Sequence, residues 1–289
     1  MSNSRRSVAS TIALRMLPEL RALHRPTSGI SSIETIPKFL RDQSGDLVRL
    51  AAIHRSWHRH VDACWAAGLN PLILAPMAHG KTVQLVIGRV CHFIGSAELE
   101  RPNGRPILGR NARIKIVCND EASAADRVRT IGENLESPEY HRIFPSIVRS
   151  RTGPWNTQVL NIQRDPRVRQ IDSTVAGKGI LSTGIGGRAD LLVFDDIVDF
   201  RNCIAEPANR KKINETFGST WMSRLEPWGK VVLVGTRWHA LDLYGILKET
   251  QGWCCLEQAI SDEFRVITCK LFGWDEKRHG TYPPFSELQ

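Results

Sequence analysis

The sequence predicts a doubly wound α/β fold, in which a mostly parallel sheet carries helices on both faces. Short apolar runs at residues 71–75, 191–194 and 231–234 have the length and composition of buried strands, and residues 113–118 form a further predicted strand. Stretches with the apolar spacing of helices lie between these runs, which is the alternation typical of crossover connections. Polar residues follow the ends of the runs. Because ligands of such folds bind at the carboxyl ends of the strands, these polar residues are the candidates for function.

The predicted elements follow one another in chain order. The first run continues through a glycine-containing turn into a helix on which Val83, Val86 and Val90 share one face. The second strand, at residues 113–118, precedes a predicted helix at residues 121–135. Between the third and fourth strands, apolar side chains recur every four residues, which predicts one long helix. These side chains are Ile213, Phe217, Trp221 and Leu225.

The composition is that of a globular protein with a basic excess. Of 289 residues, 42% are hydrophobic and 24% are charged, which excludes wholesale disorder, collagen and coiled coil. The 39 Lys and Arg against 30 Asp and Glu give a net charge of 39 − 30 = +9. No apolar run approaches the roughly 20 residues of a membrane-spanning helix. Seven scattered cysteines without a Cys-x-x-Cys pair argue against disulfides and against a structural zinc site, and they indicate a reducing compartment.

The basic excess is concentrated near the amino terminus. Residues 1–60 hold ten Lys and Arg and four Asp and Glu, so 10 − 4 = +6 of the charge lies there. We expect residues 1–45 to form a basic arm or helix, because apolar residues recur there at spacings near one and two helical turns: Val8, Ile12, Leu17, Leu20 and Leu23. The composition of the first 32 residues would also fit a transit peptide. A second basic cluster lies in residues 151–190. Either segment could contact nucleic-acid phosphates or simply form a solvated surface.

The first candidate site is the turn after the first strand, residues 75–82 (APMAHGKT). It matches the phosphate-binding loop G-x-x-x-x-G-K-[ST] except that Ala75 replaces the first glycine. Such a turn presents backbone N–H groups and a helix amino terminus to an anion. Lys81 can reach the β- and γ-phosphates of ATP, and the Thr82 hydroxyl can ligate Mg²⁺. The predicted nucleotide-binding residues of this turn are Ala75, Pro76, His79, Gly80, Lys81 and Thr82.

Two carboxylates close the third strand. Asp195 and Asp196 directly follow the apolar run at residues 191–194. In a nucleotide hydrolase the first acid holds Mg²⁺, and the next orients and deprotonates the attacking water. Alone, two acids at a strand end are more often a helix cap or a turn. Together with the phosphate loop, they lead us to assign Asp195 to the metal and Asp196 to the water.

A third polar segment, residues 231–239 (VVLVGTRWH), follows the fourth strand and contains Thr236. Thr236 could sense the γ-phosphate and pass its loss to the rest of the molecule. It could equally cap a helix that begins near Leu241, with Trp238 packing beside it. The sequence leaves both interpretations open.

Three segments together resemble the large subunit of tailed-phage terminases. They are the phosphate loop, the glycine-rich approach to the two acids at residues 184–190 (GIGGRAD), and residues 235–239 (GTRWH) with the following 242–245 (DLYG). The resemblance covers residues 54–260. It implies a RecA-like P-loop ATPase domain at residues 46–260 that uses ATP and Mg²⁺ as cofactors. It also implies a motor that hydrolyses ATP to move double-stranded DNA into a capsid.

The same resemblance implies partners and a place of action. Members of this family assemble as rings on the portal protein of an empty capsid, work with a terminase small subunit, and act in the host cytoplasm, without a membrane. Ring motors use an arginine across the subunit boundary, and Arg188 is our candidate. Trp57, His58 and Arg59 lie where the family's adenine contacts fall, although a core or surface role fits each of them better.

The sequence departs from the family pattern in three places. Met77 stands where many members have an arginine, and Asp196 stands where many have a glutamate. Only 289 − 260 = 29 residues follow Ile260, so we expect residues 261–289 to be a linker or tail and the chain to lack nuclease activity. Two alternatives therefore stay open. One is another nucleic-acid-dependent ATPase such as a helicase, and the other is a nucleotide-binding assembly factor that does not hydrolyse.

Overall fold

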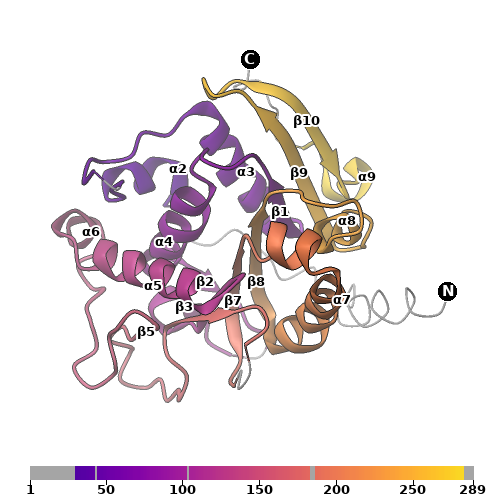
Figure 1. Ribbon diagram of the computed structural model, residues 1–289. Coiled ribbons are helices and arrows are strands. Elements are labelled where there is room, and N and C mark those ends of the chain that lie inside the picture. Colours follow the sequence, from indigo (N-terminus) through magenta and orange to yellow (C-terminus); the bar gives the residue numbers. More distant parts are fainter. Residues whose placement is uncertain (1–29, 43, 103, 183–185, 283–289) are drawn as a thin grey trace.

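The computed structural model describes residues 30–42, 44–102, 104–182 and 186–282, and it confirms the predicted α/β fold (Figure 1). One eight-stranded sheet has the order β10-β9-β1-β8-β7-β4-β6-β5. Its inner strands are parallel: β1 (Asn70–Leu74), β4 (Ile114–Cys118), β6 (Val175–Gly179), β7 (Ala189–Asp195), β8 (Leu225–Gly235) and β9 (Trp253–Ile260). The edge strands β5 (Val159–Leu160) and β10 (Val266–Phe272) are antiparallel, and β2 (Glu98–Leu99) pairs with β3 (Ile107–Leu108) apart from the sheet.

Helices cover both faces of this sheet (Figure 1). One face carries α2 (Ser32–Thr35), η2 (Ile36–Lys38), α3 (Ala52–Ala66), η3 (Thr82–Gly88), α4 (Arg89–Ser96), α5 (Glu121–Leu135) and α6 (Pro138–Ile143). The other carries α7 (Pro207–Thr216), η6 (Phe217–Trp221) and α8 (Leu243–Lys248). Short turns complete the described elements: η4 (Gly109–Asn111), η5 (Arg201–Ala205), η7 (Met222–Arg224) and α9 (Glu276–His279).

Two hydrophobic clusters lie on the two faces of the sheet, and successive strand residues alternate between them. On β1, Ile73 packs into the first cluster, whereas Leu72 and Leu74 pack into the second. On β7, Val193 and Phe194 divide in the same way. This double burial explains why the strands read as continuous apolar runs rather than as alternating ones.

The predicted long helix between the third and fourth strands is wrong at its end. Ile213, Phe217 and Trp221 do share a buried helical face, on α7 and η6. Leu225, however, is the first residue of β8, which is much longer than the predicted run at residues 231–234. Leu225 continues the four-residue spacing only by chance. It is apolar because it packs against the second cluster as part of β8.

The sheet and its core extend beyond residues 46–260 on both sides. Ile36, Phe39 and Leu40 are fully buried in the first cluster, although they belong to the segment that we expected to be an arm. After Ile260 the chain turns back and adds β10 to the edge of the sheet. Residues 1–29 lie outside the described residues, and the placement of the domain boundaries stays a prediction. Within the described ranges, no helix is both long and apolar enough to cross a bilayer.

A buried ion pair fixes the amino end of β7, where the glycine-rich segment leads into the strand. The Asp190 carboxylate has no exposed surface and accepts hydrogen bonds from Arg113 Nε (2.9 Å), Arg113 Nη2 (3.0 Å) and Trp228 Nε1 (2.9 Å). Arg113 also pairs with Glu226 at 2.8 Å. Asp190 therefore holds β4, β7 and β8 together at the end of the sheet opposite to Asp195 and Asp196.

We expect Asp190→Ala to lower the free energy of unfolding by about 3–5 kcal/mol, because it leaves the Arg113 guanidinium partly uncompensated in the interior. Urea denaturation followed by tryptophan fluorescence measures this change. The exposed Asp126→Ala variant on α5 is the matched control and should change stability by less than about 0.5 kcal/mol. Equal stabilities of the two variants would show that Asp190 does not hold the strands.

Candidate nucleotide-binding site

The predicted site residues converge because the strands that carry them are neighbours in the sheet. β8 lies between β1 and β7, with Leu74 opposite Gly235 and Val234 opposite Asp195. All three strands run in the same direction, so their carboxyl ends meet at one edge of the sheet. The phosphate loop, the two acids and Thr236 each begin at this edge.

Lys81 lies at the centre of this arrangement. Its ammonium group donates to the carbonyl oxygens of Ala75 (2.7 Å) and Pro76 (2.8 Å) and to Thr236 Oγ1 (2.9 Å). The residue is only 4% exposed. Burial lowers the pKa of Lys81, and the charges of Asp196 and Asp195 act in the opposite direction. All three N–H donors of the ammonium group are thus used, two by carbonyl oxygens and one by a hydroxyl oxygen. Phosphate oxygens could take the places of these acceptors.

The backbone of residues 75–82 is shaped for an anion. Ala78 and Gly80 both have positive φ, 63° and 78°, and this conformation favours glycine. A Cβ on Gly80 would also lie 3.4 Å from His54 Nε2. Ala75, by contrast, is outside the left-handed region, so alanine is accommodated where the usual motif has its first glycine. Met77, which stands at the family's arginine position, is 62% exposed.

The His79 side chain fastens this loop to the far edge of the sheet. Its Nδ1 lies 2.7 Å from the Met77 carbonyl oxygen, and its Nε2 lies 3.0 Å from the Ser261 carbonyl oxygen, in the turn between β9 and β10. The His79 carbonyl oxygen accepts a hydrogen bond from His54 Nε2 at 3.0 Å. Because the Ala51 N–H donates to His54 Nδ1 (3.2 Å), the proton of the neutral His54 ring is on Nε2. These bonds assign the His79 ring to the support of the loop.

Asp195 and Thr82 face each other across the candidate metal position. The Thr82 hydroxyl lies 3.0 Å from both carboxylate oxygens of Asp195, which is 1% exposed. Hydroxyl and carboxylate oxygens are the ligands that Mg²⁺ prefers. The donor set therefore fits the ion that the sequence motifs imply, with Thr82 and Asp195 as the residues that would hold it.

Arg127 is a site residue that the sequence did not indicate. Its Nε donates to Asp195 Oδ2 at 2.8 Å from the second turn of α5. β4, which precedes α5, pairs with β7 so that Cys118 is opposite Asp195. The available signal was a basic residue near the start of α5, the helix that follows β4. The sequence does not show that β4 lies beside β7, so this signal could not be interpreted.

Arg127→Ala is expected to destabilise the nucleotide-free protein by about 1–3 kcal/mol, because the buried Asp195 carboxylate loses its cationic partner. At roughly 2–4 °C per kcal/mol, this lowers Tm by several degrees. A divalent cation at Asp195 would replace the lost charge, so added Mg²⁺ with an ATP analogue should reduce the difference. Thermal unfolding with and without these ligands measures both effects. A Tm deficit that Mg²⁺ and nucleotide leave unchanged would contradict the placement of the cation beside Asp195.

Asp196 has the properties of a general base. Its φ of 45° is unusual for a residue with a Cβ, and its N–H donates to the Val234 carbonyl oxygen at 3.1 Å. Burial and then the charge of Asp195 raise the pKa of Asp196 to about 6, against the charges of Lys81 and Arg127. Its buried Oδ1 has no hydrogen-bond partner among the residues that the structure describes. An unsatisfied carboxylate oxygen with a raised pKa is suited to receive a proton from a bound water.

Thr236 contacts Lys81, and the alternative that it caps the helix that follows is wrong. Its Oγ1 accepts from Lys81 and lies 3.2 Å from the Ala75 carbonyl oxygen. The N-cap of α8 is Asp242, whose Oδ1 accepts a hydrogen bond from the Gly245 N–H at 2.8 Å. Thr236 thus links the end of β8 to the loop of residues 75–82.

Arg188 is not brought together with the other predicted site residues. It precedes β7, whereas Asp195 ends that strand, so seven residues separate them and place them roughly 20 Å apart. Arg188 is 47% exposed in its side chain and lies 3.3 Å from Glu226 Oε2. Within one chain it cannot reach the phosphate loop. Of the residues near the family's adenine position, Trp57 is fully buried and donates to Gln258 Oε1 at 2.7 Å, and His58 is fully buried too.

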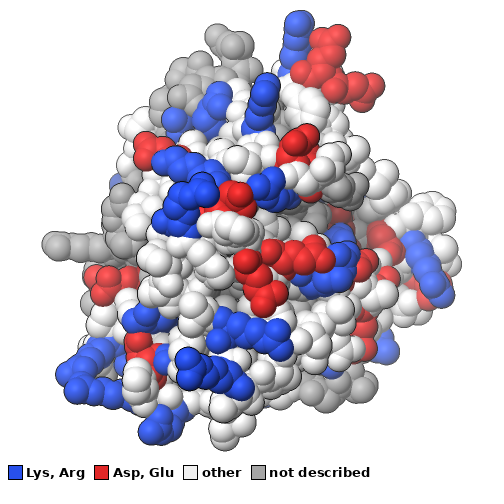
Figure 2. Space-filling view, turned by 90° about the vertical axis from the view of Figure 1, so that its left-hand side faces the viewer, with Lys and Arg blue, Asp and Glu red and all other residues white. Residues whose placement is uncertain are grey.

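Two members of the basic cluster at residues 151–190 have partners within the chain. Arg164 donates to the carbonyl oxygen of Asp172 at 2.6 Å, and Lys178 pairs with Glu121 at 3.6 Å. On the face seen in Figure 2, Lys and Arg side chains gather in the lower part with few acids among them, and both signs are interspersed above. The contribution of this cluster to nucleic-acid binding stays a prediction.

Fold and site together define an α/β protein with a candidate anion-binding loop and paired acids at the carboxyl edge of its sheet. No protein-family model and no curated protein matches the sequence. Solved structures do match, among them the large terminase of bacteriophage HK97, with a TM-score of 0.49 and 15% sequence identity. The match covers 76% of this chain and 40% of the HK97 chain, so this chain spans less than half the length of that protein.

Proposed function

We propose that this chain is an Mg²⁺-dependent ATPase that drives viral DNA packaging, with the role of a terminase large subunit. The observation that carries the proposal is the convergence of Lys81, Thr82, Asp195, Asp196 and Thr236 at one edge of the sheet. A loop with a lysine, a hydroxyl facing a carboxylate, and a second acid with a free oxygen are the groups that ATP hydrolysis requires.

Each residue has a role that follows from its contacts. Lys81 exchanges its carbonyl partners for the β- and γ-phosphate oxygens, and Thr82 and Asp195 hold Mg²⁺. When bound, this ion neutralises the charge that develops on the phosphates. Asp196 accepts the proton of the attacking water at its unpaired oxygen. Thr236, which bonds to Lys81, is placed to register the loss of the γ-phosphate and pass it to β8.

The proposed partners are double-stranded DNA, bound without sequence preference, a portal protein and a terminase small subunit. The active form is a ring of identical chains in the host cytoplasm, positioned transiently on the procapsid portal. Because the exposed Arg188 side chain lies far from the site of its own chain, it is our candidate for an arginine that completes a neighbour's site.

The experiment that tests this function measures phosphate release with and without duplex DNA and portal rings. A packaging motor should hydrolyse ATP faster when both are present. The logarithm of its binding constant for DNA should fall linearly with the logarithm of the salt concentration, with a slope of about −0.9 per phosphate neutralised. A helicase would instead unwind a forked duplex. An assembly factor would bind ATP but release phosphate as slowly as its Lys81→Ala variant under all conditions, and this last result would reject the motor.

A further inference from the structure

Three potential metal ligands meet on the side of the molecule away from the nucleotide site. His60 and Cys64 lie one turn apart on α3, and Cys254 is the second residue of β9. All three are buried, and their ligand atoms lie within 4.8 Å of one another. β9 starts at this end of the sheet, where Asn70 of β1 is opposite Trp253, whereas the phosphate loop follows the other end of β1. The cluster is therefore separate from the candidate ATP site.

We propose that His60, Cys64 and Cys254 bind a zinc ion. Cys64 Sγ lies 3.6 Å from His60 Nε2 and 3.8 Å from Nδ1. Ligands of a tetrahedral zinc ion, with Zn–S of about 2.3 Å and Zn–N of about 2.0 Å, are themselves separated by roughly 3.5–3.8 Å. The two side chains therefore already have the spacing of zinc ligands, and two thiols with one imidazole select zinc over Mg²⁺ or Ca²⁺.

His60 is oriented by an outer hydrogen bond. Tyr282 places its hydroxyl 2.7 Å from His60 Nδ1, which leaves Nε2, the nitrogen nearer to Cys64, to face the metal. In protein zinc sites the second ring nitrogen usually donates to an oxygen, and this bond fixes the ring. Nε2 now lies 3.2 Å from the Cys254 carbonyl oxygen, and it would exchange this contact for the metal.

The charge balance suits a buried position. Zinc binding converts the thiols of Cys64 and Cys254 to thiolates and releases two protons to solvent, so the bound ion and its two sulfurs are neutral together. The apolar surroundings, which include Leu69, Leu271 and Trp274, can accommodate such a neutral centre.

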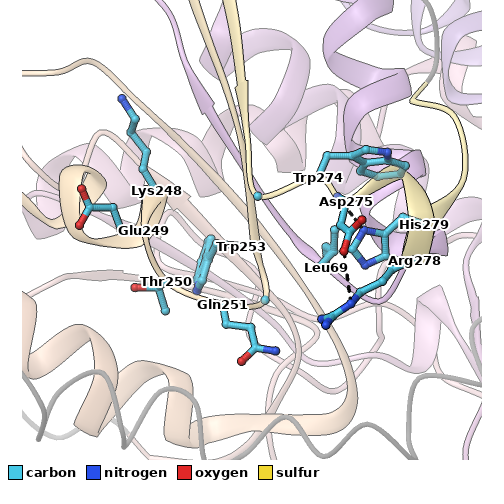
Figure 3. Close-up of a pocket in the computed structure, with 12 residues that line it drawn as sticks. Leu69, Lys248, Glu249, Thr250, Gln251, Trp253, Trp274, Asp275, Arg278 and His279 are labelled. Carbon is cyan, nitrogen blue, oxygen red and sulfur yellow. Dashed lines mark hydrogen bonds and ion pairs between the residues drawn. The ribbon is translucent and has the colours of Figure 1, made fainter.

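The proposed site borders a cavity and would connect three segments of the chain. A cavity of about 330 Å³ lies beside it, lined by Trp253 and Thr250 on one side and by Leu69, Trp274 and His279 on the other (Figure 3). Leu69 and Trp274 also pack around Cys64 and Cys254, so one layer of side chains separates the cavity from the cluster. Trp274 stacks edge-on against Tyr282 at 5.1 Å. Zinc would thus join α3, β9 and the segment around α9 through Tyr282.

The sequence argued against a zinc site because its cysteines are not paired locally. The ligands come instead from a His-x₃-Cys pair on one helix and a cysteine 254 − 64 = 190 residues later. Only the pairing of β9 with β1, on which α3 packs, brings them together.

The test uses the whole chain, purified under reducing conditions and dialysed against Zn²⁺ or Co²⁺. We expect about one equivalent of zinc per chain, and a thiolate-to-cobalt charge-transfer band with Co²⁺. Cys64→Ser and Cys254→Ser should each lose the band. Cys255→Ser is the matched control, because Cys255 is equally buried next in the chain but belongs to the second hydrophobic cluster. Tyr282→Phe should bind zinc about 10–100-fold more weakly while retaining the thiolate band.

The Co²⁺ spectrum of the wild-type chain keeps the proposal testable even where a variant fails to fold. A folded wild-type chain without the charge-transfer band would overturn the proposal, as would a band that Cys64→Ser and Cys254→Ser both retain. Because Lys81→Ala leaves these ligands intact, it should bind zinc as the wild type does, so failure of the ATPase proposal and failure of the zinc proposal are distinguishable.

Discussion

Asp196→Asn is expected to abolish ATP hydrolysis and at the same time to stabilise the folded protein. An asparagine has nearly the same shape but cannot accept the proton of the attacking water. General-base catalysis contributes about 10²–10⁴ in rate, so kcat should fall by this factor while ATP still binds. Single-turnover phosphate release and nucleotide binding, measured side by side, separate the two quantities. Hydrolysis within a few-fold of wild type would remove Asp196 from the mechanism.

The stabilising effect follows from the pKa of Asp196. Burial raises this pKa from the ordinary 3.8 to about 6. Between these pH values the folded state binds more protons than the unfolded state, so the free energy of unfolding falls as pH rises through this range. An asparagine at this position does not titrate, so the variant does not lose this stability as pH rises. The Tm of Asp196→Asn should therefore exceed that of the wild type at pH 8, and the difference should shrink as pH falls from about 6 to about 4.

The exposed Asp126→Asn variant is the control for the pH experiment, because the Asp126 side chain is 64% exposed. It should follow the wild-type Tm at every pH. A Tm difference for Asp196→Asn that does not change between pH 8 and pH 4 would contradict the raised pKa. Stabilisation combined with loss of activity is the pattern expected where a protein holds a functional group in an unfavourable environment.

Lys81→Ala is expected to reduce ATP hydrolysis by at least about 10²–10³-fold, the loss typical of removing one charged group that stabilises the transition state. It should also weaken ATP binding, because the cation that neutralises the phosphates is gone. The loop itself should persist, since His79 still holds it through the carbonyl oxygens of Met77 and Ser261. Steady-state phosphate release measures the rate, and circular dichroism checks the fold.

Lys211→Ala provides the comparison for Lys81→Ala, because Lys211 on α7 has a side chain that is 80% exposed. Its hydrolysis rate should equal that of the wild type. If the two alanine variants had the same rate, Lys81 would have no role in hydrolysis. A helical content lowered only in Lys81→Ala would show that the ammonium group, rather than His79, holds the loop.

The sequence predicted β1, β4, β7 and the second half of β8, but it did not predict β5, β6, β9 and β10. The apolar runs of β1, β7 and β8 are local signals, and the lysine loop and the two acids each follow directly from a strand. The end of the helix before β8 was not predictable, since Leu225 is apolar in a helix and in a strand alike. Its burial against the second cluster satisfies either pattern.

Contacts that depend on the order of the strands in the sheet could not be predicted from the sequence. Arg127 reaches Asp195 only because β4 lies beside β7, and His60 meets Cys254 only because β9 lies beside β1. His79 was predicted as a nucleotide-binding residue, and this stays a prediction; the contact of its ring with Ser261, in a turn 182 positions away, was not predicted. Contacts between segments that are distant in the chain have no signature in spacing or composition.

Calorimetric titration with a non-hydrolysable ATP analogue tests the central claim most directly. The wild-type chain should bind about one nucleotide, and the binding should require Mg²⁺, because we propose that Thr82 and Asp195 would hold the ion beside the phosphates. Lys81→Ala and Thr82→Val should each weaken binding, and Lys211→Ala should not. Binding that is independent of Mg²⁺ and equal in the wild type, Lys81→Ala and Thr82→Val would contradict a nucleotide site at this edge of the sheet.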